Sequence, residues 1–180
     1  MIALAYVKIV ALPGNAFAGG VMVVDGRGLP LDFRYTEPVQ PSKVQQVLYG
    51  KSLDRHVRQD VIFKQLAAKI DPRPALVLVD DEILLGLAAA ASVALVVETR
   101  LTPLREVALV QTVTDQEVLL QAGETGSPLR VKIAKAEPGG AEKAAEALLE
   151  AARQGLDLTE PFNRIRGALE VLCSASSARE

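Results

Sequence analysis

The sequence predicts a single α/β domain built on a mixed β-sheet, and two observations lead to this fold class. Residues 75–79 and 93–97 are unbroken apolar runs rich in Val and Leu, the pattern of strands buried on both faces of a parallel sheet. The apolar segment between them predicts a crossover helix that begins at Asp81. Three strand-like segments precede this unit. We therefore expect an antiparallel three-stranded meander, then a parallel βαβ unit, and at the C-terminal end a hairpin and two helices.

The meander is expected in the first part of the chain. Residues 4–12 form its first strand, in which Lys8 is the single charge. Residues 21–24 are continuously apolar, which suits a central strand. The sequence Asp-Gly-Arg-Gly at 25–28 is a strong hairpin signal. Residues 29–36 alternate between apolar and polar side chains, so one face of this third strand should meet solvent.

Two helices are expected between the meander and the parallel unit. Ser42 and Gln45 have the spacing of a capping box, which opens the first helix. A second helix runs from Ser52 to about Ile70, where a proline-rich segment ends it. The residues expected on the apolar sides are Val44, Val47 and Leu48 in the first helix, and Leu53, Val57, Val61, Ile62, Leu66 and Ile70 in the second.

The signals after residue 100 predict further strands and two terminal helices. Residues 106–113, 117–121 and 129–134 are strand-like, with a turn before the last of them. Residues 141–154 have apolar positions at helical spacing and end at a glycine. A last helix is capped by Thr159.

Length and composition indicate one intracellular domain. At 180 residues the chain can bury one substantial core, and we assign residues 1–173 to the domain and 174–180 to a flexible tail. The longest uncharged apolar run, 83–97, is short of the roughly 18 to 20 residues that span a bilayer, and no signal peptide is evident. Cys173, the one cysteine, excludes an internal disulfide and fits a reducing cytoplasm. A net charge of -2 argues against a nucleic-acid partner.

The order of elements resembles that of the ribonuclease-H-like fold over roughly residues 1 to 100. This resemblance implies one mixed sheet with helices on both faces. It also implies an enzyme that holds two metals about 4 Å apart with several carboxylates, one of which usually comes from the first strand. The sequence departs from that pattern, because residues 4–12 carry no carboxylate and the first acid of the chain is Asp25.

One group of carboxylates falls where the two parallel strands end. In open α/β sheets the carboxyl ends of the strands border the ligand crevice, so Asp80, Asp81 and Glu98 could meet there. Together with Asp25 they are candidate ligands of a hard divalent cation such as Mg²⁺. The alternative interpretation is that Asp80 and Asp81 cap a helix and that Glu98 ends a strand facing water.

A local basic patch surrounds the predicted elbow between the first two helices. It could receive a phosphate or an acidic partner surface, but interleaved acids also allow a solvated helix face. The patch consists of Lys43, Tyr49, Lys51, Arg55, His56 and Arg58.

These observations lead to two functional hypotheses. No nucleophile, base or metal constellation is assembled by the sequence motifs, which favours a non-catalytic binding or assembly module without a cofactor. Its partner would be another protein or a second copy in a homodimer, bound through residues 40–58 or an edge strand within 107–134. The alternative is a divalent-metal-dependent phosphodiesterase or nuclease of ribonuclease-H-like type that uses Asp25, Asp80, Asp81 and Glu98.

Overall fold

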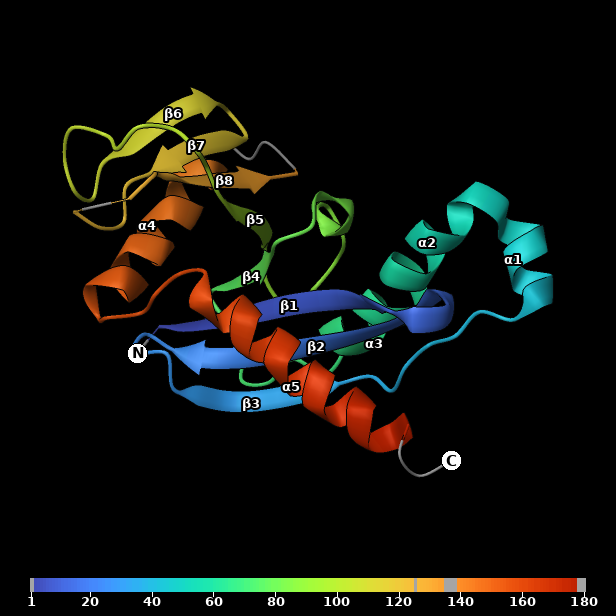
Figure 1. Cartoon of the computed structure of the whole chain (residues 1–180). Coiled ribbons are helices and arrows are strands. Elements are labelled where there is room, and N and C mark those ends of the chain that lie inside the picture. The colour runs from blue at the N-terminus through green and yellow to red at the C-terminus, as the bar shows by residue number, and fades with distance from the viewer. Residues whose placement is uncertain (1, 125, 135–138, 178–180) are drawn as a thin grey trace.

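The computed structural model describes residues 2–124, 126–134 and 139–177, and within them the chain forms one mixed eight-stranded sheet (Figure 1). The strand order across the sheet is β3-β2-β1-β4-β5-β8-β7-β6. The strands are β1 (Ala3–Leu12), β2 (Ala16–Asp25), β3 (Pro30–Tyr35), β4 (Leu76–Val79), β5 (Val93–Glu98), β6 (Val110–Thr114), β7 (Glu117–Leu120) and β8 (Leu129–Ile133).

The topology confirms the predicted fold class. β1, β2 and β3 are an antiparallel meander, and β4 and β5 add to it as parallel strands on the other side of β1. The predicted C-terminal hairpin, β7 and β8, does not stand apart. It joins the same sheet through an antiparallel pairing of β8 with β5, and β6 forms the far edge.

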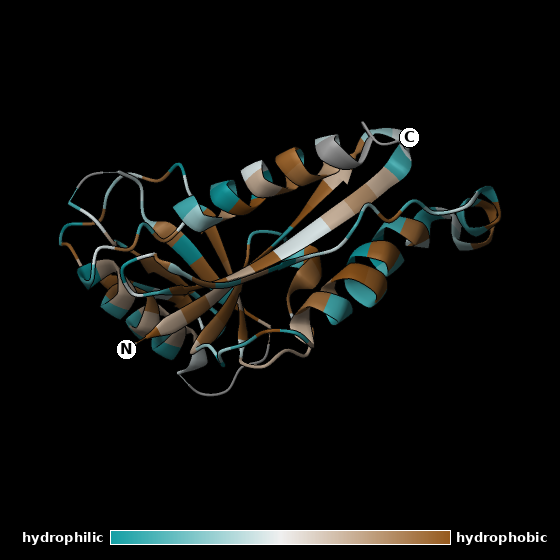
Figure 2. Cartoon of the chain, turned by 90° about the horizontal axis from the view of Figure 1, so that it is seen from below, coloured by the Kyte–Doolittle hydropathy of each residue, from teal (hydrophilic) through white to brown (hydrophobic). Residues whose placement is uncertain are grey.

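Helices cover both faces of the sheet (Figure 2). One face is covered by the later part of a helical region, in which η3 has π-type hydrogen bonding, and the other face is covered by two C-terminal helices. The helical region between β3 and β4 comprises α1 (Lys43–Tyr49), η2 (Gly50–Ser52), α2 (Leu53–His56), η3 (Val57–Phe63) and α3 (Lys64–Ala67). The C-terminal helices are α4 (Gly140–Arg153) and α5 (Glu160–Ser177). Two short 3₁₀ turns lie elsewhere in the chain, η1 (Pro13–Asn15) and η4 (Glu82–Leu84).

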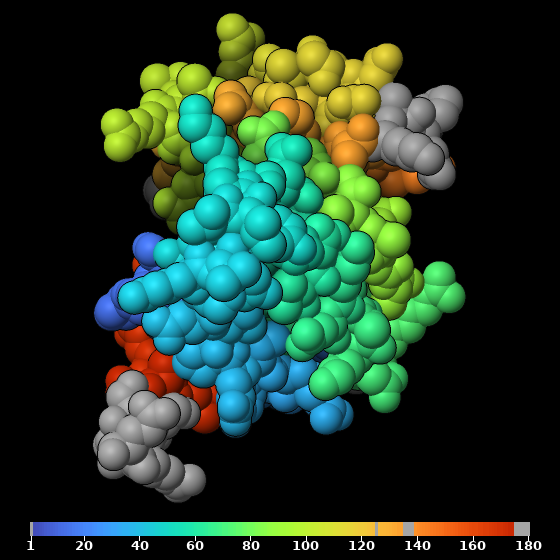
Figure 3. Space-filling model, turned by 90° about the vertical axis from the view of Figure 1, so that its right-hand side faces the viewer, coloured from blue at the N-terminus to red at the C-terminus, as the bar shows by residue number. Residues whose placement is uncertain are grey.

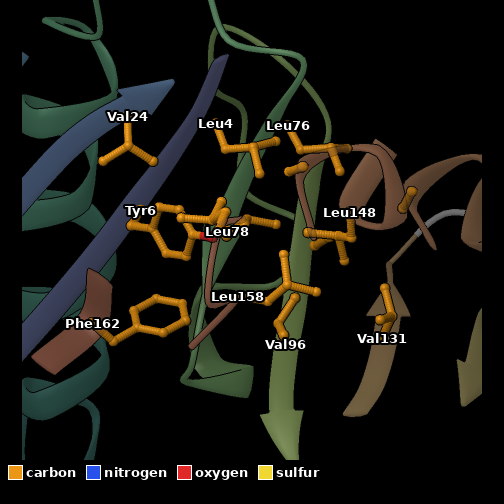
Figure 4. Packing of buried hydrophobic residues seen from close by; sticks show 14 of the residues in the cluster. Leu4, Tyr6, Val24, Leu76, Leu78, Val96, Val131, Leu148, Leu158 and Phe162 are labelled. Carbon is orange, nitrogen blue, oxygen red and sulfur yellow. The ribbon is translucent and has the colours of Figure 1, made fainter. Parts of the chain in front are cut away.

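The core under α4 and α5 is made by alternate residues of the central strands. Leu4 and Tyr6 of β1 and Leu78 of β4 point to this face, where they meet Leu148 of α4 and Phe162 of α5 (Figure 4). Tyr6 and Phe162 pack edge to face, with ring centroids 5.0 Å apart. Such an arrangement suits the quadrupoles of the two rings.

The opposite core joins the sheet to η3 and α3. Val7 and Val79 point to this face and pack with Ile62 and Leu66, which are fully or almost fully buried. Gly19 of β2 lets this helical segment come close, because a Cβ at that position would overlap Cγ2 of Ile62 and lie 3.0 Å from Cδ1 of Leu66. The side chains of Ile62 and Leu66 therefore pack directly against the strand backbone at Gly19.

The predicted crossover helix between β4 and β5 is wrong. The chain makes only the 3₁₀ turn η4 after β4 and then continues without regular helix to β5. Leu85 is already extended, with φ -68° and ψ 135°, and Gly86 follows it with a positive φ of 86°, so helical geometry does not continue past that turn. The alanines that follow have little apolar surface to bury, so packing does not restore a helix in this segment.

The predicted burial of the first helix is also wrong. The capping box is present, since Ser42 accepts from the Gln45 backbone while the Gln45 side chain accepts from the Ser42 backbone. Yet Val44, Val47 and Leu48 are 67%, 83% and 76% exposed. We call residues 43–52, which comprise α1 and η2, the arm. It extends away from the sheet and faces the viewer in Figure 3.

The C-terminal helix is longer than predicted. α5 continues to Ser177, so the tail predicted from residue 174 begins as helix, and residues 178–180 lie outside the described residues. Among the described helices, none is long and apolar enough to cross a membrane.

Candidate functional site at the ends of β1 and β4

The centre of the candidate site is an ion pair between neighbouring parallel strands. Val7 pairs with Val79 in the β1–β4 register, so Lys8 and Asp80 follow as the next residues along the two strands. The Lys8 ammonium donates to Oδ2 of Asp80. The two side chains are only 13% and 23% exposed, which makes this the most shielded pair in the site. The interaction is consequently screened less than a surface pair.

Asp81 and Glu82, which follow Asp80, are also paired with cations. Each of these three consecutive acids meets a cationic side chain from a different element. Oδ2 of Asp81 lies 2.9 Å from Nη1 of Arg58, which comes from η3. Glu82 pairs with Lys132 of β8, and this hydrogen bond lowers the pKa of the Glu82 carboxyl. We call this set the charged edge: Lys8, Arg58, Asp80, Asp81, Glu82 and Lys132.

Arg58 is held at the charged edge by three contacts. Its Nε donates to Asp54 at 3.0 Å, and its guanidinium carbon lies 5.0 Å from the ring centroid of Phe17. The third contact is the ion pair with Asp81. Arg58 sits in the π-helical turns of η3, and wider turns of this kind change the direction of side chains relative to an α-helix.

Glu98 lies at the end of β5 on the same sheet face as Lys8 and Asp80 but is bound elsewhere. Oε1 of Glu98 accepts from the Thr159 hydroxyl at 3.1 Å, just before α5. Thr159 and Asp157 also line a hollow of about 400 Å³ between the connection from α4 to α5 and the turn before β8. Glu98 is therefore bonded to a residue that lines this hollow, and not to Lys8 or Arg58.

Asp25 is not brought to the other three carboxylates. It is the last residue of β2 and pairs with Ala3, at the beginning of β1, whereas Asp80 stands beside Lys8 further along that strand. Its Oδ1 accepts from the backbone N–H groups of Arg27 and Leu29, each at 2.9 Å. The hydrogen bond from Leu29 is the main cause that lowers the pKa of the Asp25 carboxyl. Asp25 therefore holds the hairpin turn.

The donor set does not fit the divalent metal implied by the ribonuclease-H-like resemblance. Within the described residues there is no cluster of three or more His, Cys, Asp or Glu side chains placed to share an ion. Asp80 and Asp81 are each already bonded to a cationic side chain. A metal bound by Asp80 and Asp81 would have to displace the Lys8 ammonium from Asp80, and it would be repelled by the Arg58 guanidinium that is paired with Asp81.

Tyr6 is a feature of this region that the sequence did not single out. It lies two residues before Lys8 on the same face and is fully buried. Its hydroxyl has no hydrogen-bond partner among the described residues. Burial raises the pKa of this phenol above its ordinary value, and Asp157 adds to the shift.

The structure divides the predicted basic patch. Arg58 joins the charged edge, whereas His56 stacks on Tyr49 with ring centroids 4.4 Å apart and bonds to Asp60. Lys43, Lys51 and Arg55 are exposed and lie on the arm and α2. The signal that could have found Lys8 was present in the sequence. It is the single charge of the first strand, and pairing that strand in parallel with residues 75–79 brings it near the acid that follows them.

Comparison with known proteins identifies the fold by structure alone. No protein-family profile matches the sequence, and no curated protein sequence does. An endonuclease V from Streptomyces avermitilis superposes with a TM-score of 0.62 at 10% identity, covering 97% of this chain and 82% of that one. The fold is that of endonuclease V.

Two further structures agree. Human endonuclease V has a TM-score of 0.52 at 12% identity, covering 98% of this chain and 86% of that one. Endonuclease V from Ciona intestinalis, in complex with DNA containing an inosine followed by a ribo-adenosine, has a TM-score of 0.53 at 11% identity, with coverages of 94% and 86%. The likeness thus extends over nearly the whole chain, well beyond the residues 1–100 on which the sequence resemblance rested.

This likeness corrects two predictions. The non-catalytic binding or assembly module is wrong as the leading hypothesis, because three structures that share the fold over nearly the whole chain are endonucleases, which favours the phosphodiesterase alternative. The prediction against a nucleic-acid partner is also wrong, because a structure of this fold holds DNA. Both predictions relied on the net charge and on linear motifs, neither of which records how distant segments meet in the fold.

Proposed function

We propose that this chain is a phosphodiesterase that acts on a nucleic-acid strand at the charged edge. The observation that carries the proposal is the likeness of nearly the whole chain to endonuclease V structures, one of which contains DNA. The shielded pair of Lys8 and Asp80 supports it, since a cation and a carboxylate held together by two central strands are groups that phosphoryl transfer can use.

Hydrolysis of a phosphodiester adds water across one P–O bond. The Asp80 carboxylate takes a proton from the attacking water while the new O–P bond forms, and Lys8 stabilises the negative charge that gathers on the phosphoryl oxygens. As the second P–O bond breaks, the leaving oxygen takes a proton from Lys8. Asp80 then returns its proton to Lys8 across their hydrogen bond, and both groups regain their charges.

The charge balance of the edge is compatible with a phosphate backbone. Three carboxylates would repel a phosphate if they stood alone, but Lys8, Arg58 and Lys132 offset them one for one. Lys43 and Lys51 add positive charge along the arm, in which no acid occurs. We place the strand across the edge, with the reacting phosphate at Lys8.

Cleavage of labelled nucleic acids tests this function. We would incubate the full chain with fluorescently end-labelled single-stranded and duplex DNA and RNA, with Mg²⁺, with Mn²⁺ and with EDTA, and resolve the products on denaturing gels. Asp80→Asn should lower the cleavage rate by about 10²- to 10⁴-fold, the range of a lost general base. If wild-type protein leaves every substrate intact in all three conditions, the proposal fails.

A matched variant separates chemistry from surface charge. Asp32 of β3 pairs with Arg34 at 3.0 Å, away from the charged edge, so Asp32→Asn makes the same change in charge at another ion pair. It should leave the cleavage rate within about two-fold of wild type, because the field of a charge far from the reacting phosphate is screened by salt. An equal loss of rate in both variants would contradict the role of Asp80.

We also propose a cytoplasmic location. Cys173 is the one cysteine of the chain, and burial raises the pKa of its thiol, so it carries little thiolate at neutral pH. This is compatible with a reducing compartment in which nucleic acids are present.

A further inference from the structure

We propose that the Lys8 ammonium occupies the place of a divalent cation at the charged edge, so that this centre holds its phosphate without taking up a metal. This inference rests on the proposed function for the identity of the phosphate. The claim about metal is independent of it, because it concerns only the side chains of this chain.

The first support is the position of the ammonium. Lys8 projects from the middle of β1 against the carboxylate that follows β4, on the sheet face covered by α5. The side chain is 13% exposed, so its aliphatic part is shielded while the ammonium reaches Asp80. A metal bridging β1 and β4 would need this same place.

The second support is the supply of ligands around the ammonium. A divalent ion needs several oxygen ligands that carry no other cation. Asp81 is held by Arg58 and also caps η4 through the backbone N–H of Ile83, at 3.1 Å. Glu82 is held by Lys132. The carboxylates are thus committed to side-chain cations, in a region with no three-ligand cluster among the described residues.

The third support is the donor count of the ammonium. A lysine ammonium has three N–H donors and no acceptor, and one of them is used by Asp80 in the described structure. The others suit the oxygens of a phosphate, which a lysine binds as a point charge. Lys8 can therefore join a carboxylate and a phosphate as a bridging cation would, with one positive charge in place of two.

Binding of Mn²⁺ itself, measured by calorimetry and by the loss of the free-ion electron paramagnetic resonance signal, tests the inference without any activity assay. Wild-type protein should bind no Mn²⁺ at the charged edge. Lys8→Asp removes the ammonium and adds a carboxylate opposite Asp80, and it should gain a Mn²⁺ site at least ten-fold tighter than any residual binding of Mn²⁺ by wild-type protein. Adding Asp80→Asn to that variant should abolish the gain.

Two further variants keep the test decisive. Lys8→Met removes the cation without adding an oxygen ligand, so it should gain much less affinity than Lys8→Asp. If circular dichroism shows that Lys8→Asp is unfolded, Lys8→Asn offers a neutral oxygen ligand at the same place and should show the gain instead. Wild-type binding of Mn²⁺ that disappears in Asp80→Asn, or a folded ligand variant that gains nothing, would overturn the inference.

Failure of this inference differs from failure of the proposed function. If the metal experiments give the expected result but wild-type protein cleaves no nucleic acid, the function is wrong and the ammonium still takes the metal's place. If wild-type protein cleaves nucleic acid only when Mg²⁺ or Mn²⁺ is added and binds Mn²⁺ through Asp80, the function stands and the inference is wrong. Cleavage that continues within two-fold in EDTA would support both.

Discussion

The charged edge joins six charged side chains and the arm carries two lysines, Lys43 and Lys51, and the chain builds the two regions in opposite ways. The edge draws its members from β1, η3, the residues after β4, and β8, so its ion pairs join segments up to 72 residues apart. The arm is one continuous stretch, and none of the seven residues of α1, all of them described, is buried. A cluster that is contiguous in sequence was easier to notice, but the cluster built by the fold is the one shielded from solvent.

The largest expected contrast is between the base and the tip of the same helical segment. Leu66 is 2% exposed under the sheet, and Leu48 is 76% exposed on the arm. Leu66→Ala should lower the free energy of unfolding by about 2 to 5 kcal/mol. Leu48→Ala should change it by less than about 0.5 kcal/mol. Urea denaturation followed by circular dichroism measures both, and a large loss in Leu48→Ala would mean that the arm is packed in solution.

The next contrast concerns the shielded pair of the charged edge. Asp80→Ala leaves the Lys8 ammonium poorly solvated and without its carboxylate, which should lower the free energy of unfolding by about 1.5 to 3 kcal/mol. Asp54→Ala is the comparison, since Asp54 is 52% exposed and pairs with Arg58 on one helical segment. That loss should be about 0.5 kcal/mol or less. Equal losses would show that the edge is no better shielded than the helix surface.

The attachment of η3 to the sheet can be changed without altering any charge. Gly19→Ala places a methyl group against Ile62 and Leu66 and should lower the free energy of unfolding by about 1 to 3 kcal/mol, through overpacking. Gly167→Ala is the matched control, because a Cβ there meets nothing within 4 Å among the described residues. In α5 it should raise the free energy of unfolding by about 0.5 to 1 kcal/mol. Chemical denaturation measures the free energy of unfolding of both variants and distinguishes the expected decrease in Gly19→Ala from the expected increase in Gly167→Ala.

The smallest expected effect is a pH dependence at the exposed end of the edge. The hydrogen bond from Lys132 lowers the folded pKa of Glu82, so its contribution to stability is present above the unfolded pKa of about 4.3 and is lost as pH falls through the lower folded value. Glu82→Gln should therefore make the loss of stability below about pH 4.5 shallower. Urea denaturation of wild type and Glu82→Gln at several pH values, with and without 0.5 M NaCl, measures this pH dependence. If the free energy of unfolding of the two proteins falls equally steeply with pH in low salt, the role of the Glu82–Lys132 pair is contradicted.

Several elements were predictable because their signals are local. The Val-rich runs that became β4 and β5, the Asp25 turn and the Ser42 capping box depend on residues a few positions apart. Two features were not predictable in the same way: the connection from β4 to β5, which has only the short 3₁₀ turn at Glu82–Leu84 in place of a helix, and the exposure of Val47. Their outcomes depend on whether distant surfaces are available to cover an apolar segment, and periodicity alone does not contain that information.

The candidate site shows the same division. By itself the sequence determined that carboxylates follow the strand at 76–79, that Lys8 is the only charge on the first strand, and that no carboxylate stands there. Only the tertiary structure decided that Lys8 meets Asp80, that Arg58 meets Asp81, and that Asp25 stays at the other end of β1. The reason is that strand register and helix packing are cooperative properties of the whole sheet, and they set which charges become neighbours.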